Sequence, residues 1–359
     1  MQIQVHGGDI YSKAYRLDFS TNINPFGMPE SLKQAAIKGI DASIHYPDVQ
    51  CRELINAIAK KEEIPSDWII CGNGAAELLF SLVSAKKPQK ALLVSPGFAE
   101  YEQAARAMDA QMVYYYLKEE MEFRLDETFL EMLTNDVDMV FLCNPNNPTG
   151  HLIEKELLLS ILKRCVEQDI FLVVDECFND FLNQPQAYSL LNELEHYENL
   201  LILKAFTKTY AMAGLRLGYG LCSNQAFLQK MADCSQPWAV SIPAQFAGVA
   251  ALKETAYVQE SMELLKTERA FLKAELKQLG FQVFDSQANY IFFKAMPGLK
   301  QACAERGILI RDCSNYVGLV PGYFRIGVKR HEENQKLVSV LKEIVNRKNC
   351  NSSAFCKQA

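Results

Sequence analysis

The stretch VDMVFLCNPNNPTGHLIEKELLLSILKRCVEQDIFLVVDECF, which spans residues 137–178, decides the fold. It begins as an apolar strand that runs into a polar, proline-bearing loop, Asn144–Gly150. A helical pattern follows over Glu154–Gln168, and the apolar letters FLVV then lead into Asp175. Near-continuous apolar strands that alternate with helices are typical of a parallel sheet covered on both faces. The stretch therefore predicts an α/β protein.

The same alternation continues before and after this stretch. ALLVSPG (91–97) and NLLILKAFTK (199–208) also have the apolar runs of buried strands. In open α/β sheets, ligands bind beyond the carboxyl ends of the strands. Asn147, Asp175 and Lys208 each follow one of the predicted strands. We therefore expect these three side chains, which lie far apart in the sequence, to converge on one crevice.

The pattern changes after about Gln245. A long helical stretch leads to apolar strands over 289–295 and 323–328, and an amphipathic helix is predicted over 333–347. This order of elements predicts a second, smaller α+β unit. The predicted parts of the chain are an N-terminal arm (1–45), a large α/β domain (46–245), a small C-terminal domain (246–347) and a polar tail (348–359).

The bulk composition narrows the possible partners. The 359 residues carry a formal net charge of -6, so the chain lacks the basic footprint of a nucleic-acid-binding protein or of a polybasic membrane patch. No apolar run approaches the ~18 residues of a membrane span, and no signal peptide is predicted. The 11 cysteines include no C-x-x-C pair, which favours reduced thiols in a cytoplasmic protein. Cys350 and Cys356 fall short of a metal ligand set, so we predict no metal site.

Each candidate residue has a structural interpretation beside the functional one. Asp175 can lie in a solvated turn, or it can be a buried carboxylate that keeps a pyridinium nitrogen protonated. The NPNNPTG loop can be only a rigid connection, or the Asn147 amide can hold a phenolate oxygen. Phe98 can pack in a core, or it can offer a planar surface to a ring. The residues alone leave these alternatives open.

A second group of residues suits an anion and a nucleophile. Gly72 and Gly74 precede a predicted helix whose N-terminal N–H groups would bind phosphate, although a glycine turn before a helix is also common. Lys208 lies in apolar company, where it is either a snorkelling side chain or a neutral amine that can form a Schiff base. Arg216, eight residues further on, would bind the same phosphate bidentately.

In chain order, these motifs resemble the fold-type I pyridoxal phosphate (PLP) enzymes of the aminotransferase superfamily. The resemblance covers nearly the whole chain and implies a three-layer, aspartate aminotransferase-like α/β fold with a mostly parallel central sheet. It implies that Lys208 forms the Schiff base with PLP and that Asp175 pairs with the pyridine nitrogen. Asn147 would contact the ring O3′, and Phe98 would stack on the ring face. The residues implied around the cofactor phosphate are Gly74, Ala75, Ala76, Thr207 and Arg216.

Two positions depart from this family pattern. The family motif usually reads DEAY, but here DECF places Phe178, which cannot donate a hydrogen bond to O3′. Ala205 stands where the family usually has a residue whose hydroxyl group binds the cofactor phosphate.

One further motif implies a partner subunit. HYPD (45–48) resembles the segment whose tyrosine reaches the cofactor phosphate of the neighbouring subunit, so Tyr46 implies a homodimer.

The N-terminal segment has two interpretations. It is either a flexible arm or the part of the chain that indicates which reaction is catalysed. HGG (6–8), followed by LDFSTNINPFG (17–27), resembles the threonine-phosphate decarboxylases, which are close relatives of the histidinol-phosphate aminotransferases. The resemblance implies that L-threonine O-3-phosphate loses CO2 and that Lys208 returns a proton to Cα. The product would be (R)-1-amino-2-propanol phosphate, the linker of the cobalamin nucleotide loop. The implied substrate contacts are His6, Ser20, Thr21, Asn22, Arg311 and Arg325.

Three other functions remain open. A histidinol-phosphate-type aminotransferase would share the same core motifs. A decarboxylase for L-serine phosphate would differ by one methyl group of the substrate, which a hydrophobic pocket discriminates by only ~1–3 kcal/mol. A PLP-binding regulator is a remote alternative, because such proteins usually carry a fused helix-turn-helix domain and this chain is acidic. For either type of enzyme, the expected partner is a small phosphorylated substrate.

Overall fold

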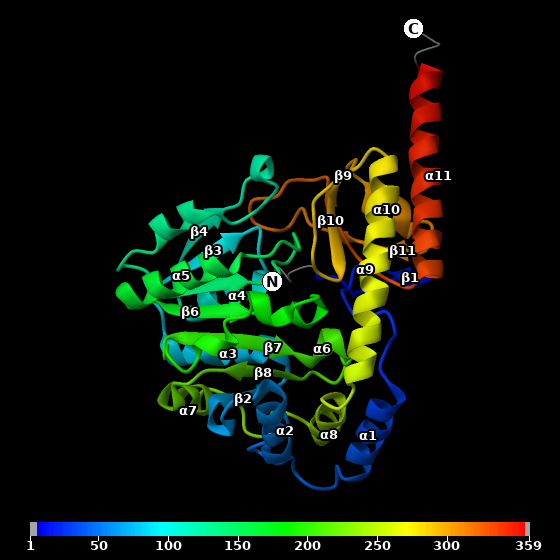
Figure 1. Ribbon diagram of the computed structural model, residues 1–359. Coiled ribbons are helices and arrows are strands. Elements are labelled where there is room, and N and C mark those ends of the chain that lie inside the picture. The colour runs from blue at the N-terminus through cyan, green and yellow to red at the C-terminus, as the bar shows by residue number, and fades with distance from the viewer. Residues whose placement is uncertain (1–5, 356–359) are drawn as a thin grey trace.

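The computed structural model describes residues 6–355 and is built around a seven-stranded sheet (Figure 1). β8 runs antiparallel to both of its neighbours, and the other neighbouring strands are parallel. The predicted mostly parallel α/β sheet is thus confirmed. In sheet order, the strands are β2 (Ile69–Gly72), β8 (Gly218–Leu221), β7 (Leu200–Ala205), β6 (Phe171–Asp175), β5 (Met139–Cys143), β3 (Lys90–Ser95) and β4 (Gln111–Tyr116).

Helices cover both faces of this sheet because its central strands bury side chains on each side. All five residues of β6 are buried, with Val174 in the apolar cluster of one face and Val173 in that of the other. Successive side chains of a strand point to opposite faces, so this apolar run requires a layer on each side. One layer contains α2 (Arg52–Glu62), α5 (Lys155–Glu167) and α8 (Ile242–Ala251), with α1 (Glu30–Asp41) packed on α8. The other layer contains α3 (Gly74–Lys86), α4 (Ala99–Ala107) and α7 (Gln225–Asp233).

A smaller unit lies beside the large sheet (Figure 1). Its four-stranded antiparallel sheet has the order β12 (Arg311–Asp312), β13 (Tyr323–Gly327), β10 (Tyr290–Lys294) and β9 (Gln282–Val283). Three helices belong to this unit: α9 (Thr255–Gln278), α10 (Leu299–Ala304) and α11 (His331–Phe355). β1 (Leu17–Asp18) pairs in parallel with β11 (Ile308–Leu309), which ties the N-terminal segment to the small unit.

The structure corrects two predicted elements. The strand predicted over 199–208 ends at Ala205, and Lys208 lies instead on the short helix α6 (Phe206–Thr209). The strand ends there because Ala205 is the last residue of β7 that pairs with β8, at Gly218. The C-terminal helix is longer than predicted, since α11 includes residues 348–355 of the predicted polar tail. Neither glycine nor proline interrupts the chain between His331 and Phe355, so the helix has no breaker.

The described residues contain no helix that is long and apolar enough to cross a membrane. Cys356 lies outside the described residues. The predicted domain boundaries at residues 45 and 245 stay predictions.

Gly218 sets how closely β8 approaches the first turn of α3. A Cβ atom added to this glycine would lie 2.4 Å from the backbone nitrogen of Ala75 and 2.8 Å from the carbonyl carbon of Gly74. Both contacts are with backbone atoms, which cannot move aside as a flexible side chain can. The absence of a side chain at Gly218 therefore positions the N-terminus of α3.

We expect Gly218→Ala to lower the free energy of unfolding by about 1–3 kcal/mol, because the added methyl group must displace backbone. Urea denaturation of the purified protein measures this. Gly214→Ala in the same segment is the control, since its Cβ would meet no atom within 4 Å. It should change stability by less than about 0.5 kcal/mol. Equal stability of the two variants would contradict the close approach.

Candidate functional site

The residues indicated by the sequence converge at the carboxyl edge of the large sheet. They line a cavity of about 410 Å³, a size typical of small-molecule sites. The predicted residues in its wall are His6, Ser20, Thr21, Asn22, Ala75, Ala76, Phe98, Asn147, Asp175, Phe178, Thr207, Lys208, Arg216, Arg311 and Arg325. Two predicted residues are not in the wall. Gly74 lies against the Arg216 guanidinium, and Tyr46 is 79% exposed on the outer surface.

Lys208 is placed by α6, immediately beyond the end of β7. Its side chain is partly buried in the cavity wall. Desolvation and the positive charges of Arg325 and Arg216 lower the pKa of Lys208 from its usual 10.5 to about 8. A neutral amine is a nucleophile, whereas an ammonium is not. The cavity therefore makes Lys208 suited to attack a carbonyl carbon near neutral pH.

Asp175 is the last residue of β6, and only 5% of its surface is exposed. Its Oδ2 accepts a hydrogen bond of 2.6 Å from the Tyr101 hydroxyl, and its Oδ1 accepts one of 2.9 Å from the Cys177 backbone nitrogen. These bonds fix the carboxylate in the cavity wall. A buried carboxylate held in this way is suited to a cationic partner, such as a protonated heterocycle.

Asn147 is oriented by two donors from the small unit. Its Oδ1 accepts hydrogen bonds from Arg325 and, at 3.4 Å, from the Tyr316 hydroxyl. Since the carbonyl oxygen is engaged, the NH2 group of Asn147 is left to donate into the cavity. Such a donor suits a phenolate oxygen.

The loop that carries Asn147 is held by the segment 285–290 of the small unit. The Tyr290 hydroxyl donates to the Asn146 carbonyl at 2.8 Å, and the backbone nitrogen of Gln287 donates to the Gly150 carbonyl at 2.8 Å. Gly150 has a φ of 77°, and a Cβ there would lie 2.0 Å from the Ser286 Oγ. A glycine is therefore required where the loop meets this segment.

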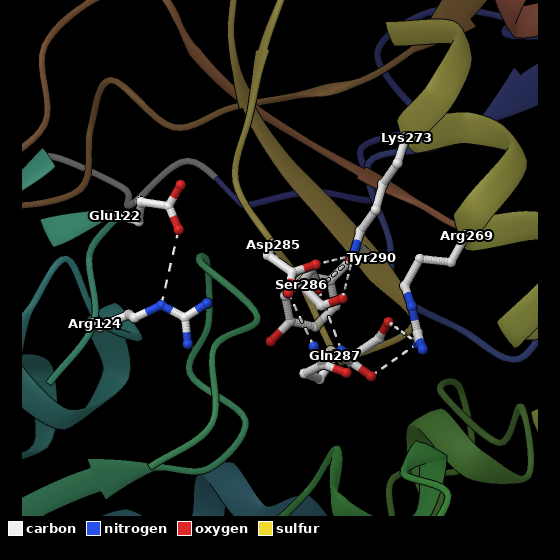
Figure 2. Close-up of polar contacts among 9 residues, drawn as sticks. Glu122, Arg124, Arg269, Lys273, Asp285, Ser286, Gln287 and Tyr290 are labelled. Carbon is white, nitrogen blue, oxygen red and sulfur yellow. Dashed lines mark hydrogen bonds and ion pairs between the residues drawn. The ribbon is translucent and has the colours of Figure 1, made fainter. Parts of the chain in front are cut away.

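The segment 285–290 is itself anchored on α9 (Figure 2). Figure 2 shows Arg269 and Lys273 reaching from the helix to this segment. Arg269 donates to the backbone carbonyls of Gln287 and Ala288 at 2.8 and 2.9 Å. Lys273 donates to the Ser286 carbonyl at 2.9 Å and pairs with the Asp285 carboxylate. The orientation of Asn147 thus depends on a chain of contacts that starts on α9.

An anion cradle lies at the start of α3. Gly74 has a φ of +79°, and a Cβ there would lie 2.5 Å from Nη2 of Arg216. The guanidinium therefore packs directly on this glycine, next to the free N–H groups of the first helical turn at Ala75 and Ala76. Thr207, at the start of α6, lies in the same wall. Helix N–H groups with an arginine fit the phosphate of a cofactor.

Arg311 and Arg325 face each other across two strands. They are directly paired between β12 and β13, and each is only 6% exposed. Arg311 donates to Asn315 at 2.8 Å, and Arg325 donates to the Ser20 carbonyl at 3.0 Å. Within residues 6–347, neither guanidinium forms an ion pair with a carboxylate, and Nε of Arg325 has no hydrogen-bond partner. Two buried, adjacent cations of this kind favour a ligand with negative charge.

The N-terminal residues reach the same cavity. Ser20 and Thr21 are tied to the Asp18 carboxylate by hydrogen bonds of 2.6 and 3.0 Å. Asn22 is buried, and its Oδ1 has no hydrogen-bond partner in the described part of the chain. His6 lies with its Nδ1 3.3 Å from the Glu100 carboxylate.

Other residues at or behind the cavity wall agree with or add to the prediction. Phe178 packs edge to face on Tyr290 at 5.1 Å and brings no hydroxyl to the cavity. The sequence did not indicate Glu100, Tyr101 or Tyr316 as site residues. Glu100 and Tyr101 lie two and three residues after Phe98, so their nearness to a candidate residue is the one signal that the sequence contained. Tyr316 had none.

Comparison with known proteins agrees with this geometry. The family model of aminotransferase class I and II matches residues 16–341. Threonine-phosphate decarboxylase of Salmonella typhimurium is 37% identical over 95% of this chain and 96% of that protein. Histidinol-phosphate aminotransferase of Methanosphaera stadtmanae is 32% identical over 92% of this chain and 90% of that protein.

A solved structure shows the same likeness in three dimensions. The histidinol-phosphate aminotransferase from Clostridium acetobutylicum superposes with a TM-score of 0.86 at 34% identity, covering 92% of this chain and 99% of that one. The fold and the cofactor class expected from the sequence are therefore confirmed. The chain belongs to the aminotransferase class I and II family, and its cofactor is PLP.

Proposed function

We propose that the protein removes CO2 from L-threonine O-3-phosphate to give (R)-1-amino-2-propanol phosphate, the linker of the nucleotide loop of cobalamin or a related cobamide. The observation that carries this proposal is the pair of buried arginines, Arg311 and Arg325, in one cavity with Lys208. A substrate with both a carboxylate and a phosphate supplies the two anions that these cations lack.

The proposed cofactor site uses the residues at the carboxyl edge of the large sheet. Lys208 would hold PLP covalently, and Asp175 would keep a proton on its ring nitrogen. Asn147 would donate to the ring oxygen, and Phe98 would lie against the ring face. Bound PLP supplies a sink for the electron pair that remains when CO2 leaves. The proposed phosphate cradle is formed by Gly74, Ala75, Ala76, Thr207 and Arg216.

The proposed substrate site uses residues of the small unit and the arm. Arg311 and Arg325 would divide the carboxylate and the phosphate between them, with contacts from Ser20, Thr21 and Asn22. Holding both ends of the substrate would fix its rotation, so that its Cα–carboxylate bond is the one oriented for cleavage. In its protonated form, the Lys208 amine is the proposed acid that would return a proton to Cα.

Two other functions are alternatives to this proposal. A histidinol-phosphate-type aminotransferase is supported by the relative from Methanosphaera stadtmanae and by the likeness to the Clostridium acetobutylicum structure. L-serine phosphate lacks one methyl group of the proposed substrate. We favour threonine phosphate because of the 37% identity to a threonine-phosphate decarboxylase and because His6 lies at the cavity.

The proposal predicts CO2 release from O-phospho-L-threonine in the absence of any oxo acid. The release is measured by trapping labelled CO2 from an isotopically labelled substrate and by detecting 1-amino-2-propanol phosphate. O-phospho-L-serine and histidinol phosphate with 2-oxoglutarate are the comparison substrates. Rapid amino transfer from histidinol phosphate without CO2 release would contradict the decarboxylase and establish the aminotransferase.

We expect the rate at which PLP attaches to the cofactor-free protein to rise with pH around a midpoint near 8. The reason is that Lys208 is neutral, and hence nucleophilic, above its pKa of about 8. Arg325→Gln removes a positive charge that disfavours the ammonium, so the pKa of Lys208 and the midpoint should both rise. Absorbance of the bound cofactor in stopped-flow mixing measures the rate.

Lys208→Ala should abolish both the absorbance spectrum of covalently attached PLP and turnover. If the variant keeps either the spectrum or the activity, another residue holds PLP.

We infer that the protein forms a homodimer with shared active sites. An exposed apolar surface begins near the end of α1 and includes Ile40, Ile44, Tyr46, Val49 and Trp238, which are 48–85% exposed. The rings of Tyr46 and Trp238 lie 4.8 Å apart within it. Large apolar side chains exposed in one region are typical of a protein interface, and Tyr46 would reach the phosphate site of the partner.

Shared sites predict that two inactive variants complement each other. Co-expressed Lys208→Ala and Tyr46→Ala chains should form mixed dimers in which one of the two sites contains both native residues. Part of the activity should therefore return after tandem affinity purification. Lys208→Ala with Asp175→Ala is the control pair, because each of these changes disables its own subunit's site. Recovery in both pairs, or in neither, would contradict a shared site.

A further inference from the structure

Glu100 is a carboxyl group within an otherwise cationic cavity. It lies in the first turn of α4, and its side chain is 15% exposed. Its Oε1 is 3.3 Å from Nδ1 of His6. Its Oε2 is buried and has no hydrogen-bond partner among residues 6–355. Burying a carboxylate costs free energy unless nearby charges or hydrogen bonds replace its lost hydration. The groups that surround Glu100 must therefore offset this cost.

Three elements present positive charge to this carboxyl group. They are the N-terminal arm with His6, α6 with Lys208, and β12 with Arg311. Burial raises the pKa of Glu100, while the positive charges of His6, Lys208 and Arg311 act in the opposite direction. Of these three groups, His6 is the one that lies within ion-pair distance. The carboxylate therefore depends most directly on the imidazole.

Two glycines bring the imidazole to this position. A Cβ on Gly7 would lie 2.4 Å from the Ser20 carbonyl oxygen, and a Cβ on Gly8 would lie 2.9 Å from Cγ2 of Thr21. Gly8 also has a φ of +84°, and its backbone nitrogen donates to the Ser20 Oγ at 2.7 Å. The segment 6–8 can therefore lie directly on residues 20–21 only because it has no side chains at these two positions.

We propose that Glu100 is a positioning residue that holds the His6 imidazole, and with it the segment 6–8, against the substrate cavity. Because Nδ1 of His6 faces Glu100, Nε2 is the nitrogen that remains to donate to an anionic group of the substrate. The inference rests on the proposed function for the identity of that anion, which is the phosphate or the carboxylate of the substrate. It assigns a role to Glu100, a carboxyl group that takes no part in the proposed chemistry.

This role has a consequence for specificity. The Glu100 carboxylate lies 3.3 Å from Nδ1 of His6, and an imidazole held in this way can present its other ring nitrogen to an anion of the substrate. Loss of Glu100 should therefore weaken the binding of the substrate, whereas the bond-breaking step near Lys208 should be little affected. A group that acts only on binding changes KM and leaves kcat nearly constant.

The test compares Glu100→Gln with Glu102→Gln in the holoenzyme. Glu102 is on the same helix, and its carboxylate pairs with Arg106 on the surface at 2.6 Å, so its substitution is a matched control. We expect Glu100→Gln to raise the KM for O-phospho-L-threonine about tenfold, the loss typical of one charge-assisted hydrogen bond. The value of kcat should stay within about twofold. His6→Gln should have the same effect, and the double variant should be no worse than either single one.

Hydrogen–deuterium exchange without substrate gives a second readout that does not depend on the reaction. Glu100→Gln should speed exchange of the Gly7 and Gly8 amides, whereas Glu102→Gln should not. A loss of kcat at constant KM, additive effects of the Glu100 and His6 changes, or unaltered exchange would each overturn the proposal. If the wild-type protein releases no CO2, the proposed function fails, and the exchange experiment still decides whether Glu100 holds the arm.

Discussion

The partial burial of the Lys208 amine among positive charges is the constraint on which the rest of the site depends. An ammonium group loses hydration in this wall and is repelled by Arg325 and Arg216, so the neutral amine is favoured. The same arginines have no carboxylate partner within the described residues. A single arrangement of charge thus makes the lysine nucleophilic and makes the cavity attractive to negatively charged ligands.

This arrangement requires both sheets. Lys208 and Asp175 follow strands of the large sheet, whereas Arg311 and Arg325 come from the small one. The loop of Asn147 lies between them, because the small unit supplies both donors to its side chain. Neither unit contains the whole site. The placement of the small unit beside the large sheet therefore sets the distance between the nucleophile and the groups that would hold a substrate.

Much of this could be predicted from the sequence, for a definite physical reason. Apolar periodicity, turn residues and helix starts are local signals, so they located the strand that ends at Asp175 and the loop that carries Asn147. The strand over 199–208 was predicted too long, because β7 ends with the pairing of Ala205 to Gly218. That pairing joins segments on either side of α6 and the loop that follows it, and nothing in the strand's own composition marks it.

The sequence by itself determined the α/β class, the PLP family and the cluster of candidate residues, because each follows from short motifs in a fixed order. Only the tertiary structure decided which side chains of α4 reach the cavity or the residues that line it. The Tyr101 hydroxyl donates a hydrogen bond to Asp175, and the Glu100 carboxylate lies 3.3 Å from His6. In the sequence of an amphipathic helix, however, an acidic residue or a tyrosine has the same appearance whether it faces solvent, a core or a ligand. Which face meets the site depends on how separate layers pack, and no local pattern contains that information.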